Sequence, residues 1–306
     1  GTVKVKNGGS LTIEAGSVIT AVLTDGSDAL LVENGGKLFL NGTAALPIVF
    51  TEASKTPGSW GGIIMFGDAP IVGANGVTTA TSEDGNNLPY GGTNATHNGG
   101  TLKYVRVEYA GKKLTDNTSE MNGFSFYSVG SGTVLENLVA YKGADDGFEF
   151  YGGTVSAKNL ISYGNFDDSF DWQDGWRGDA NTNWYAYQVV TDNYGMEIEA
   201  KSINNAFGPK VSNITLTRAA GTVTEGGSSA NEFDAIQFKK EGNGEYTNVV
   251  ISGYTTSNTT LTATAVRIQD KSTNDNQVTG GKIKMLNVKI NDGTSQFAGV
   301  GTTFTV

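Results

Sequence analysis

Seven carboxylates crowd the glycine- and aromatic-rich stretch at 143–178, GADDGFEFYGGTVSAKNLISYGNFDDSFDWQDGWRG. Carboxylate oxygens are the ligands that Ca²⁺ takes in proteins, and paired carboxyl groups can also act as general acid and base. Asp side chains at turns can instead cap backbone N–H groups. Turn capping, a calcium site and catalysis therefore stay open as three interpretations. In the calcium interpretation the metal ligands are Asp145, Asp146, Asp167, Asp168, Asp171 and Asp174.

The acids form two copies of one pattern, Asp-Asp-x-Phe-acid, separated by an offset of 22 residues. The alignment places Asp145 on Asp167 and Glu149 on Asp171. If one repeat is one coil of a solenoid, these like charges lie side by side, which destabilises a sheet. A bound cation, a raised carboxyl pKa or a basic partner such as Arg177 would relieve the repulsion.

The candidate catalytic residues of this stretch are Glu149, Asp171 and Arg177. Both acids alternate with aromatic residues, so a strand that turns its aromatics inward points the acids to an external groove. A glycosidase requires two carboxyl groups flanking such a groove, whereas a lyase requires a base and a cation. No nearby basic residue belongs to a motif typical of polysaccharide lyases. The sequence leaves open whether the protein is an enzyme.

Aromatic residues gather directly after the acids, within residues 172–194. Exposed rings beside carboxylates are typical of sugar-binding platforms, because the apolar faces of sugars stack on them. The predicted carbohydrate-binding residues are Trp176, Trp184 and Tyr185. The alternative is that the rings pack against the body of the fold, which is favoured for Trp172.

The elements that must position these groups are short strands. Runs of three to six strand-forming residues are bounded by Gly, Asn, Asp or Ser, and helical periodicity is nearly absent. A period near 22 residues built from such strands predicts coils stacked about 4.8 Å apart. Glu197 and Glu199 are predicted to lie on a solvated strand face. Asparagines that precede apolar residues are predicted to form a ladder between coils, namely Asn137, Asn159, Asn213, Asn248 and Asn287.

We therefore predict an all-β protein with one domain over residues 1–306, a single parallel β-helix. Three stretches interrupt the strand pattern and are predicted to be loop insertions, at about 72–100, 173–187 and 218–232. Loops on a rigid scaffold are where binding groups tend to lie. The insertions are therefore expected to contribute to any binding site.

Composition narrows the classes of function. The chain has 21 basic and 31 acidic residues, a net charge of −10 and no basic patch, which argues against a nucleic-acid partner. Without cysteine and with one histidine, His97, it lacks the residues for thiolate sites, multi-histidine zinc sites and a Ser-His-Asp triad. No apolar run approaches the roughly 20 residues that cross a bilayer, so the chain is not predicted to span a membrane.

Four blocks of the sequence resemble a known group of proteins. The opening GTVKVKNGGSLTIEAGSVIT resembles that of right-handed parallel β-helix surface proteins. SWGGIIMFGDAPI (59–71), GGTLKYVRVEYAG (99–111) and the two acidic copies are similar to secreted or outer-membrane-associated proteins of Bacteroidota and marine bacteria. The architecture is more distantly similar to pectate lyases, which hold calcium and acidic residues on one face. The resemblance implies a right-handed parallel β-helix solenoid at an extracellular or outer-membrane surface.

The predicted function is that of an extracellular, cell-surface binding or structural protein that contacts carbohydrate and is stabilised by Ca²⁺. One alternative is a calcium-dependent polysaccharide lyase or glycoside hydrolase. Another is an adhesin or assembly scaffold that contacts other surface proteins without a small ligand. The sequence leaves open the identity of the glycan, the native partner, the oligomeric state and whether a precursor carries a lipid anchor or sorting domain.

Overall fold

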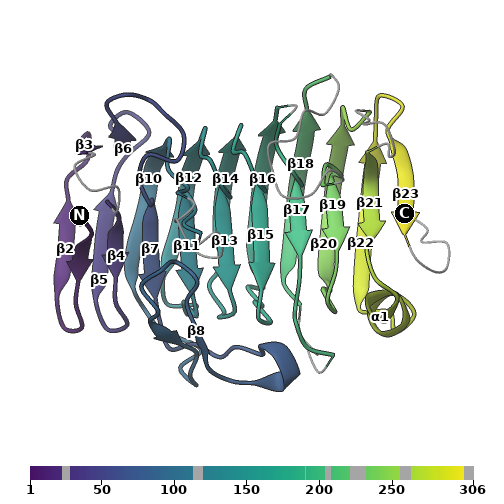
Figure 1. Ribbon diagram of the computed structural model, residues 1–306, viewed down its shortest axis with the longest axis horizontal. Coiled ribbons are helices and arrows are strands. Elements are labelled where there is room, and N and C mark those ends of the chain that lie inside the picture. The colour runs from purple at the N-terminus through teal and green to yellow at the C-terminus, as the bar shows by residue number, and fades with distance from the viewer. Residues whose placement is uncertain are drawn as a thin grey trace.

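The chain winds into a parallel β-helix, as the sequence predicted. A computed structural model describes residues 1–22, 28–112, 120–189, 191–203, 208–220, 232–255 and 263–299. Two long sheets, one of 10 strands and one of 11, run side by side along the solenoid, and each coil adds a strand to both (Figure 1). No helix in these ranges is long and apolar enough to cross a bilayer.

The first sheet contains, in spatial order, β1 (Val3–Val5), β4 (Leu30–Val32), β7 (Ile63–Phe66), β11 (Phe124–Tyr127), β13 (Phe148–Tyr151), β15 (Phe170–Gln173), β17 (Met196–Ile198), β19 (Ile236–Phe238), β21 (Thr264–Ile268) and β23 (Ser295–Gly299). Neighbouring strands are parallel throughout. The four residues of β13 and of β15 are all buried, so both faces of these strands are covered.

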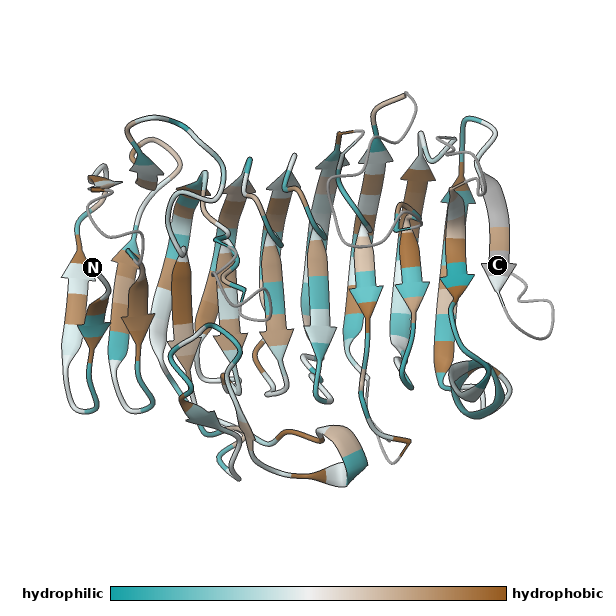
Figure 2. Cartoon of the chain, viewed as in Figure 1, coloured by the Kyte–Doolittle hydropathy of each residue, from teal (hydrophilic) through white to brown (hydrophobic). Residues whose placement is uncertain are grey.

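The second sheet contains β2 (Ser10–Ile13), β5 (Lys37–Asn41), β10 (Gly100–Glu108), β12 (Val134–Tyr141), β14 (Ala157–Tyr163), β16 (Asn181–Gln188), β18 (Lys210–Arg218), β20 (Gly244–Ser252) and β22 (Ile283–Ile290), with β3 (Val18–Ala21) and β6 (Ile48–Glu52) alongside. Hydrophobic and hydrophilic residues alternate along these strands (Figure 2). One face of this sheet therefore lines the core and the other meets solvent.

The repeat of 22 residues is one coil. In the first sheet Phe148 pairs with Phe170 and Glu149 with Asp171, and in the second Leu138 pairs with Leu160. The interior of these coils is a stack of rings, with Phe148 4.9 Å from Phe124 and 5.6 Å from Phe170 between centroids. Stacking identical positions places apolar side chains on apolar side chains, and this continuous core holds the coils together.

The predicted asparagine ladder is present on the outside of the second sheet. Each amide donates to the amide oxygen one coil earlier, at 2.7–3.1 Å. Asn183 is an additional member, which the apolar-pair pattern missed because Trp184 follows it. All six asparagines have φ between 56° and 61°, a left-handed conformation that asparagine tolerates better than most residues. The ladder therefore follows a bend that every coil repeats.

The first predicted insertion is an excursion from the solenoid. Residues 72–100 contain the short helix η1 (Ala74–Gly76) and an antiparallel pair, β8 (Ala80–Thr81) and β9 (Pro89–Tyr90), below the coils in Figure 1. The ring of Tyr90 packs 5.1 Å from that of Tyr127 and 6.2 Å from that of Tyr151, between centroids. The excursion thus covers part of the outer face of the first sheet.

The second predicted insertion is wrong. Residues 173–187 contain the end of β15, a turn and most of β16, so they are an ordinary part of the coil. Clustered aromatic residues there indicated a loop, but the rings fill the core. The third predicted insertion, 218–232, lies mostly outside the described residues. Near the carboxyl end, the helical segments α1 (Lys271–Thr273) and η2 (Asn274–Val278) join β21 to β22.

Candidate functional site

An acidic cavity of about 230 Å³ lies against the outer face of the first sheet. Outward-facing Glu149, Asp171 and Glu197 stand in register on β13, β15 and β17, one coil apart. The full lining is Glu83, Glu120, Asp146, Glu149, Asp167, Asp168, Asp171, Gln173, Glu197, Glu199, Lys201 and Lys240. The two copies of the acidic pattern therefore meet in one place.

Three overlapping carboxylate trios could hold a cation. The trios are Asp145–Asp146–Asp167, Asp146–Glu149–Asp171 and Asp168–Asp171–Glu197, and within each the nearest oxygens all lie within 4.8 Å of one another. Five of the six predicted metal ligands belong to these trios. Glu149 was expected to be catalytic and Glu197 to be solvated, yet both are buried members of the same cluster.

Asp174, the sixth predicted ligand, belongs to none of these trios. Its carboxylate accepts a hydrogen bond from the hydroxyl of Tyr90 and lies 3.9 Å from Nζ of Lys201. It therefore fastens the excursion to the turn after β15. Asp174 also lies outside the repeated pattern, at a position with φ of 53°, so its place among the metal ligands stays a prediction that the trios do not support.

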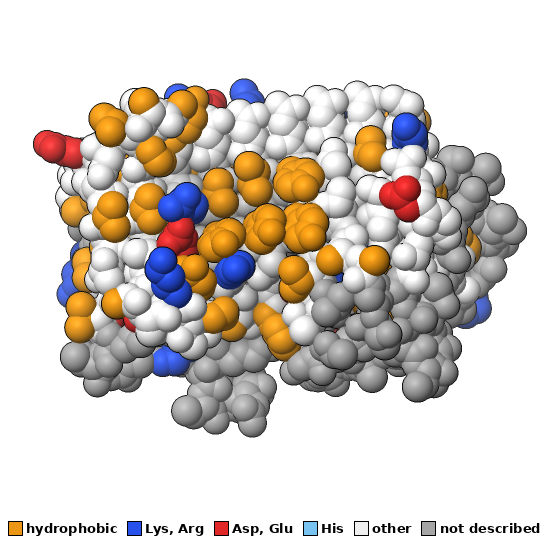
Figure 3. All heavy atoms as spheres, turned by 90° about the horizontal axis from the view of Figure 1, so that it is seen from above, with side chains coloured by type: hydrophobic (Ala, Val, Ile, Leu, Met, Phe, Trp, Pro, Cys, Tyr) orange, Lys and Arg blue, Asp and Glu red, His pale blue; other side chains and the backbone are white. Residues whose placement is uncertain are grey.

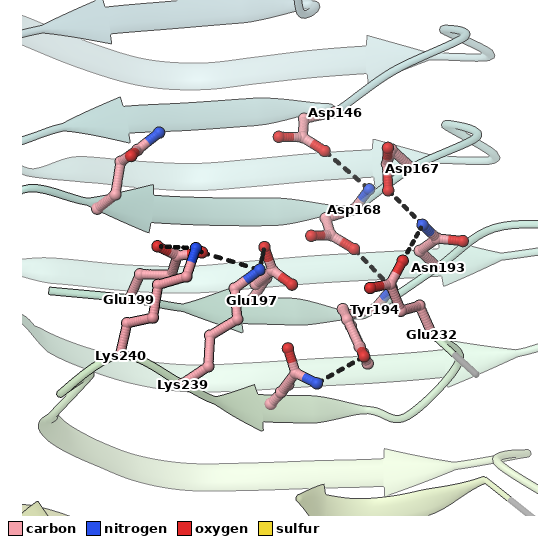
Figure 4. A network of polar contacts seen from close by, with 12 residues as sticks. Asp146, Asp167, Asp168, Asn193, Tyr194, Glu197, Glu199, Glu232, Lys239 and Lys240 are labelled. Carbon is pink, nitrogen blue, oxygen red and sulfur yellow. Dashed lines mark hydrogen bonds and ion pairs between the residues drawn. The ribbon is translucent and has the colours of Figure 1, made fainter. Parts of the chain in front are cut away.

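The repeated Asp pair also caps turns, so the turn-capping interpretation applies to these side chains. Oδ1 of Asp146 accepts from the backbone N–H of Asp168 at 2.9 Å, and Oδ1 of Asp168 accepts from that of Tyr194 at 2.7 Å (Figure 4). Each bond joins one coil to the next. Because capping uses one oxygen of each carboxylate, the second oxygen stays available to the trio.

The excursion brings its own acid to the cavity. Oε1 of Glu83 accepts from the hydroxyl of Tyr151 at 2.8 Å and from Nε2 of Gln173 at 3.3 Å. Glu149 accepts from the same Tyr151 hydroxyl and from Gln173 at 2.8 Å. Sequence reasoning missed Glu83 because no local pattern relates the excursion to β13 and β15.

Among the carboxylates that line the cavity, Asp171 has a buried oxygen without a donor in the described ranges. Asp171 is 8% exposed, and its Oδ1 makes no hydrogen bond within the described part of the chain. Oε1 of Gln173, which lines the same cavity, is also buried and without a donor. Buried polar atoms without partners are costly and uncommon, so these two oxygens are available to a cation, a proton or water.

Burial raises the pKa of four carboxyls of the cavity, and repulsion from neighbouring carboxylates adds to the effect. The pKa values of Asp146, Glu149, Asp168 and Asp171 all lie well above the usual carboxyl range. Burial raises the pKa of Glu197 to about 7, with Lys239 acting in the opposite direction. The cavity therefore retains protons near neutral pH unless a cation replaces them.

Lysines neutralise one end of the cavity. Nζ of Lys239 lies 2.5 Å from Glu197 and 2.8 Å from Glu199, and Nζ of Lys240 lies 3.0 Å from Glu199 (Figure 4). Burial opposes the charge of Glu199, but Lys239 and Lys240 hold its pKa below the usual value. No ion pair within the described ranges involves the trio Asp146–Glu149–Asp171. That trio is therefore the part of the cavity whose negative charge is least balanced by neighbouring lysines.

Two of the three predicted sugar-binding residues face the core. Trp176 and Trp184 are each 1% exposed, and the ring of Trp176 stacks 4.4 Å from that of Phe150. Their indole N–H groups donate to backbone carbonyls at 3.0 and 3.1 Å. These rings have no face left for a sugar, so the prediction is wrong for both.

Tyr185 is exposed and stands beside a row of tyrosines. It is 36% exposed, on the outer face of the second sheet. The partly exposed rings of Tyr141, Tyr163 and Tyr187 form a column, with centroids 5.4 and 4.8 Å apart. Hydrophobic side chains gather on this side of the solenoid, where the carboxyl ends of β12, β14 and β16 lie (Figure 3). In the sequence, the repeat of 22 residues aligns Tyr141 with Tyr163, and this alignment could have predicted the column.

Arg177, the third candidate catalytic residue, does not reach the acids. It lines a separate groove together with Lys210 and Lys282, and that groove shares no lining residue with the acidic cavity. Sequence proximity suggested a partner for Asp171, but the chain turns between them and directs the guanidinium to another side of the coil. Lys201 and Lys240 are the cations that line the acidic cavity instead.

Comparison with known proteins identifies the architecture. A family model described as a pectate-lyase-like beta helix domain matches residues 1–305. No curated protein matches the chain. Among solved structures, the Siphovirus 9NA tailspike receptor binding domain is similar over 92% of this chain and 53% of that one, with 11% identity and a TM-score of 0.31. The chain thus spans about half the length of that structure.

Proposed function

This chain belongs to the pectate-lyase-like β-helix domain family, and we propose that it is a surface-binding protein whose acidic cavity holds Ca²⁺ and whose outer tyrosine face contacts carbohydrate. An extracellular or outer-membrane-surface location, in a member of the Bacteroidota or a marine bacterium, is part of the same proposal. The β-helix supplies the rigid frame, and stacked copies of one acidic pattern supply the cation ligands.

The single observation that carries the cation site is the donor-free Oδ1 of Asp171 inside a cluster of carboxylates. Asp171 belongs to two trios, and in one of them, Asp146–Glu149–Asp171, no ion pair among the described residues balances the charge. Ca²⁺ takes carboxylate and amide oxygens in flexible geometry, which suits carboxylates from adjacent coils and the free oxygen of Gln173. Bound Ca²⁺ would take the place of the protons that burial retains there.

Calorimetric titration with Ca²⁺ tests the cation site. We expect saturable binding and, at a hundredfold excess over Kd, about 2.7 kcal/mol of stabilisation in thermal unfolding. Asp171→Asn removes a ligand of two trios and should weaken binding about tenfold or more. The control, Asp292→Asn, changes an exposed aspartate away from the cavity and should bind as the wild type does. Absence of Ca²⁺ binding by the wild-type protein would exclude the site.

A glycan array in the presence of Ca²⁺ tests the carbohydrate face. Tyr185→Ala should reduce the signal of any glycan bound there, because the substitution removes the most exposed ring of the tyrosine face. Leu286→Ala removes an exposed apolar side chain on β22 of the same sheet and serves as the control. Equal signals for both variants would show that the tyrosine face does not bind the glycan.

A calcium-dependent lyase is the second candidate. Lys201 and Lys240 line the same cavity as the acids. Burial opposes the charge of Lys201, but Asp174 and Glu199 raise its pKa, so this lysine would serve as a cation beside the substrate and not as the base. Incubation of a panel of acidic polysaccharides with the protein and Ca²⁺ would reveal cleavage as new reducing ends. Lys201→Gln should reduce that release, because the substitution removes a cation that lines the cavity.

A further inference from the structure

A second polar groove, of about 460 Å³, crosses the turns that precede β16, β18, β20 and β22. Successive turns are joined by backbone hydrogen bonds, from Lys210 N to Gly178 O at 2.9 Å and from Gly244 N to Lys282 O at 3.1 Å. The lining is Arg177, Asp179, Gly208, Pro209, Lys210, Asn243, Gly244, Glu245, Gly281, Lys282 and Lys284. The groove is therefore built by coil stacking, at the lower ends of these strands in Figure 1.

The groove gathers positive charge on an acidic protein. Its four cations, Arg177, Lys210, Lys282 and Lys284, outnumber its two acids, Asp179 and Glu245. Lys284 lies 3.9 Å from Glu245, and no other ion pair within the described part of the chain involves these cations. The net charge of the whole chain is −10, so this concentration of positive charge is local.

Arg177 is the one arginine among the four cations that line the groove. Its side chain is partly buried, and burial lowers the pKa of its guanidinium. In the described ranges the guanidinium has neither an ion pair nor a hydrogen-bond acceptor, while the backbone N–H is held by Gly153 O at 3.1 Å. A partly desolvated guanidinium without an acceptor is costly, and its planar fork fits the oxygens of an oxyanion. The backbone of Arg177 is therefore held in place, while the N–H donors of its guanidinium have no acceptor in the described ranges.

A smaller hollow of about 200 Å³ adjoins the groove and shares Asp179, Lys210 and Glu245 with it. Its floor is a column of hydroxyls from Thr182, Ser212 and Thr247, which are register partners on three successive coils. Hydroxyl side chains can both donate to and accept from sugar hydroxyls. The charged groove and the hydroxyl column therefore form one continuous surface with two kinds of chemistry.

We propose that this surface binds a sulfate or phosphate ester carried on a polysaccharide, with the ester over Arg177 and an adjoining sugar over the hydroxyl column. Four cations around one groove suit a strong oxyanion, and Arg177 supplies the directed hydrogen bonds. The hydroxyl column extends the contact beyond the ester. This site is separate from the acidic cavity and does not depend on Ca²⁺.

Binding of dextran sulfate, measured by calorimetry in EGTA, tests the proposal. The wild-type protein should bind it saturably, with neutral dextran showing no binding. Arg177→Gln should weaken binding about tenfold or more, because a charge-assisted hydrogen-bonding group is lost. Lys6→Gln removes an exposed lysine directly after β1, outside the groove and the hydroxyl column, and should leave the affinity unchanged. Thr247→Val should weaken the binding of dextran sulfate but not of inorganic sulfate.

Three results would overturn the proposal. The first is no saturable binding of dextran sulfate by the wild type, and the second is equal weakening by Arg177→Gln and Lys6→Gln. The third is equal affinity for inorganic sulfate and dextran sulfate per site, which would indicate a site for a small ion only. If the Arg177→Gln variant does not fold, the double variant Lys210→Gln/Lys282→Gln replaces it. This variant changes two exposed lysines of the groove and should likewise weaken the binding of dextran sulfate. Loss of Ca²⁺ binding in the acidic cavity would leave all of these results unchanged.

Discussion

At the scale of single residues, carboxyl groups of the acidic cavity have raised pKa values and so keep their protons to higher pH. A bound cation could take the place of these protons. Burial raises the pKa of Glu197 to about 7 from a model-compound value of 4.5, even with Lys239 beside it. The folded state therefore holds more protons than the unfolded chain between these pH values. A group of this kind stabilises the fold fully below its unfolded pKa, and the contribution disappears as pH rises through its folded pKa.

Thermal unfolding in EGTA should show this proton linkage. We expect Tm to fall as pH rises from about 4.5 to 7 and beyond, because Glu197 and its neighbours must ionise inside the cavity. Added Ca²⁺ should reduce the fall, since it replaces the lost protons. Glu197→Gln should flatten the pH profile in EGTA, whereas Glu14→Gln, an exposed control, should not. A Glu197→Gln profile as steep as that of the wild type would contradict this account.

At the scale of elements, the asparagine ladder joins the coils of the second sheet along their exposed side. Asn159 donates to Asn137 at 3.0 Å and accepts from Asn183 at 2.8 Å, with φ of 58°. Two requirements meet at this position, a left-handed backbone and an amide that both donates and accepts. Asparagine satisfies both, which explains why the same residue type recurs once in every coil from β12 to β22.

Asn159→Ala should lower the free energy of unfolding by about 1–3 kcal/mol, because it removes two ladder bonds and places a Cβ without compensation in the left-handed region. Asn159→Gly should cost less, since glycine adopts that conformation freely. Urea denaturation measures both, with Lys158→Ala as the exposed neighbouring control. If alanine and glycine gave equal losses, the left-handed backbone would not be part of the requirement.

At the scale of the whole molecule, one core runs along the solenoid and the surface carries different chemistry on different sides. Trp184 lies inside that core, with its centroid 4.8 Å from Phe170 and 6.0 Å from Trp176. The next residue, Tyr185, points outward. Strand alternation thus divides adjacent aromatic residues between the core and the surface.

Trp184→Ala should cost about 3–5 kcal/mol, because it leaves a large cavity between coils. Tyr185→Ala should cost only about 0.5 kcal/mol, as is usual for surface positions. Denaturant unfolding of the two variants measures the contrast. Hydrogen exchange of the Trp184 variant should rise first in β14, β16 and β18, since coils contact only their neighbours. Similar losses for both variants would contradict the assignment of Trp184 to the core.

The sequence by itself determined the parallel β-helix, the coil of 22 residues and the asparagine ladder. These features are encoded locally, in alternation along short strands and in a repeat that aligns Asp145 with Asp167 and Glu149 with Asp171. Because equivalent residues of a repeat stack in register, the alignment alone brought the acids of adjacent coils together. The sequence also predicted the excursion at 72–100, since this stretch breaks the strand pattern.

Only the tertiary structure decided what surrounds those acids and which rings are exposed. Glu83 reaches the cavity from the distant excursion, while Arg177, close in sequence, faces another groove. Trp176 and Trp184 became core residues because the turn and strand at 173–187 continue the coil. No local period encodes how a turn directs one side chain or where an excursion folds back. Those outcomes depend on packing between segments far apart in the chain.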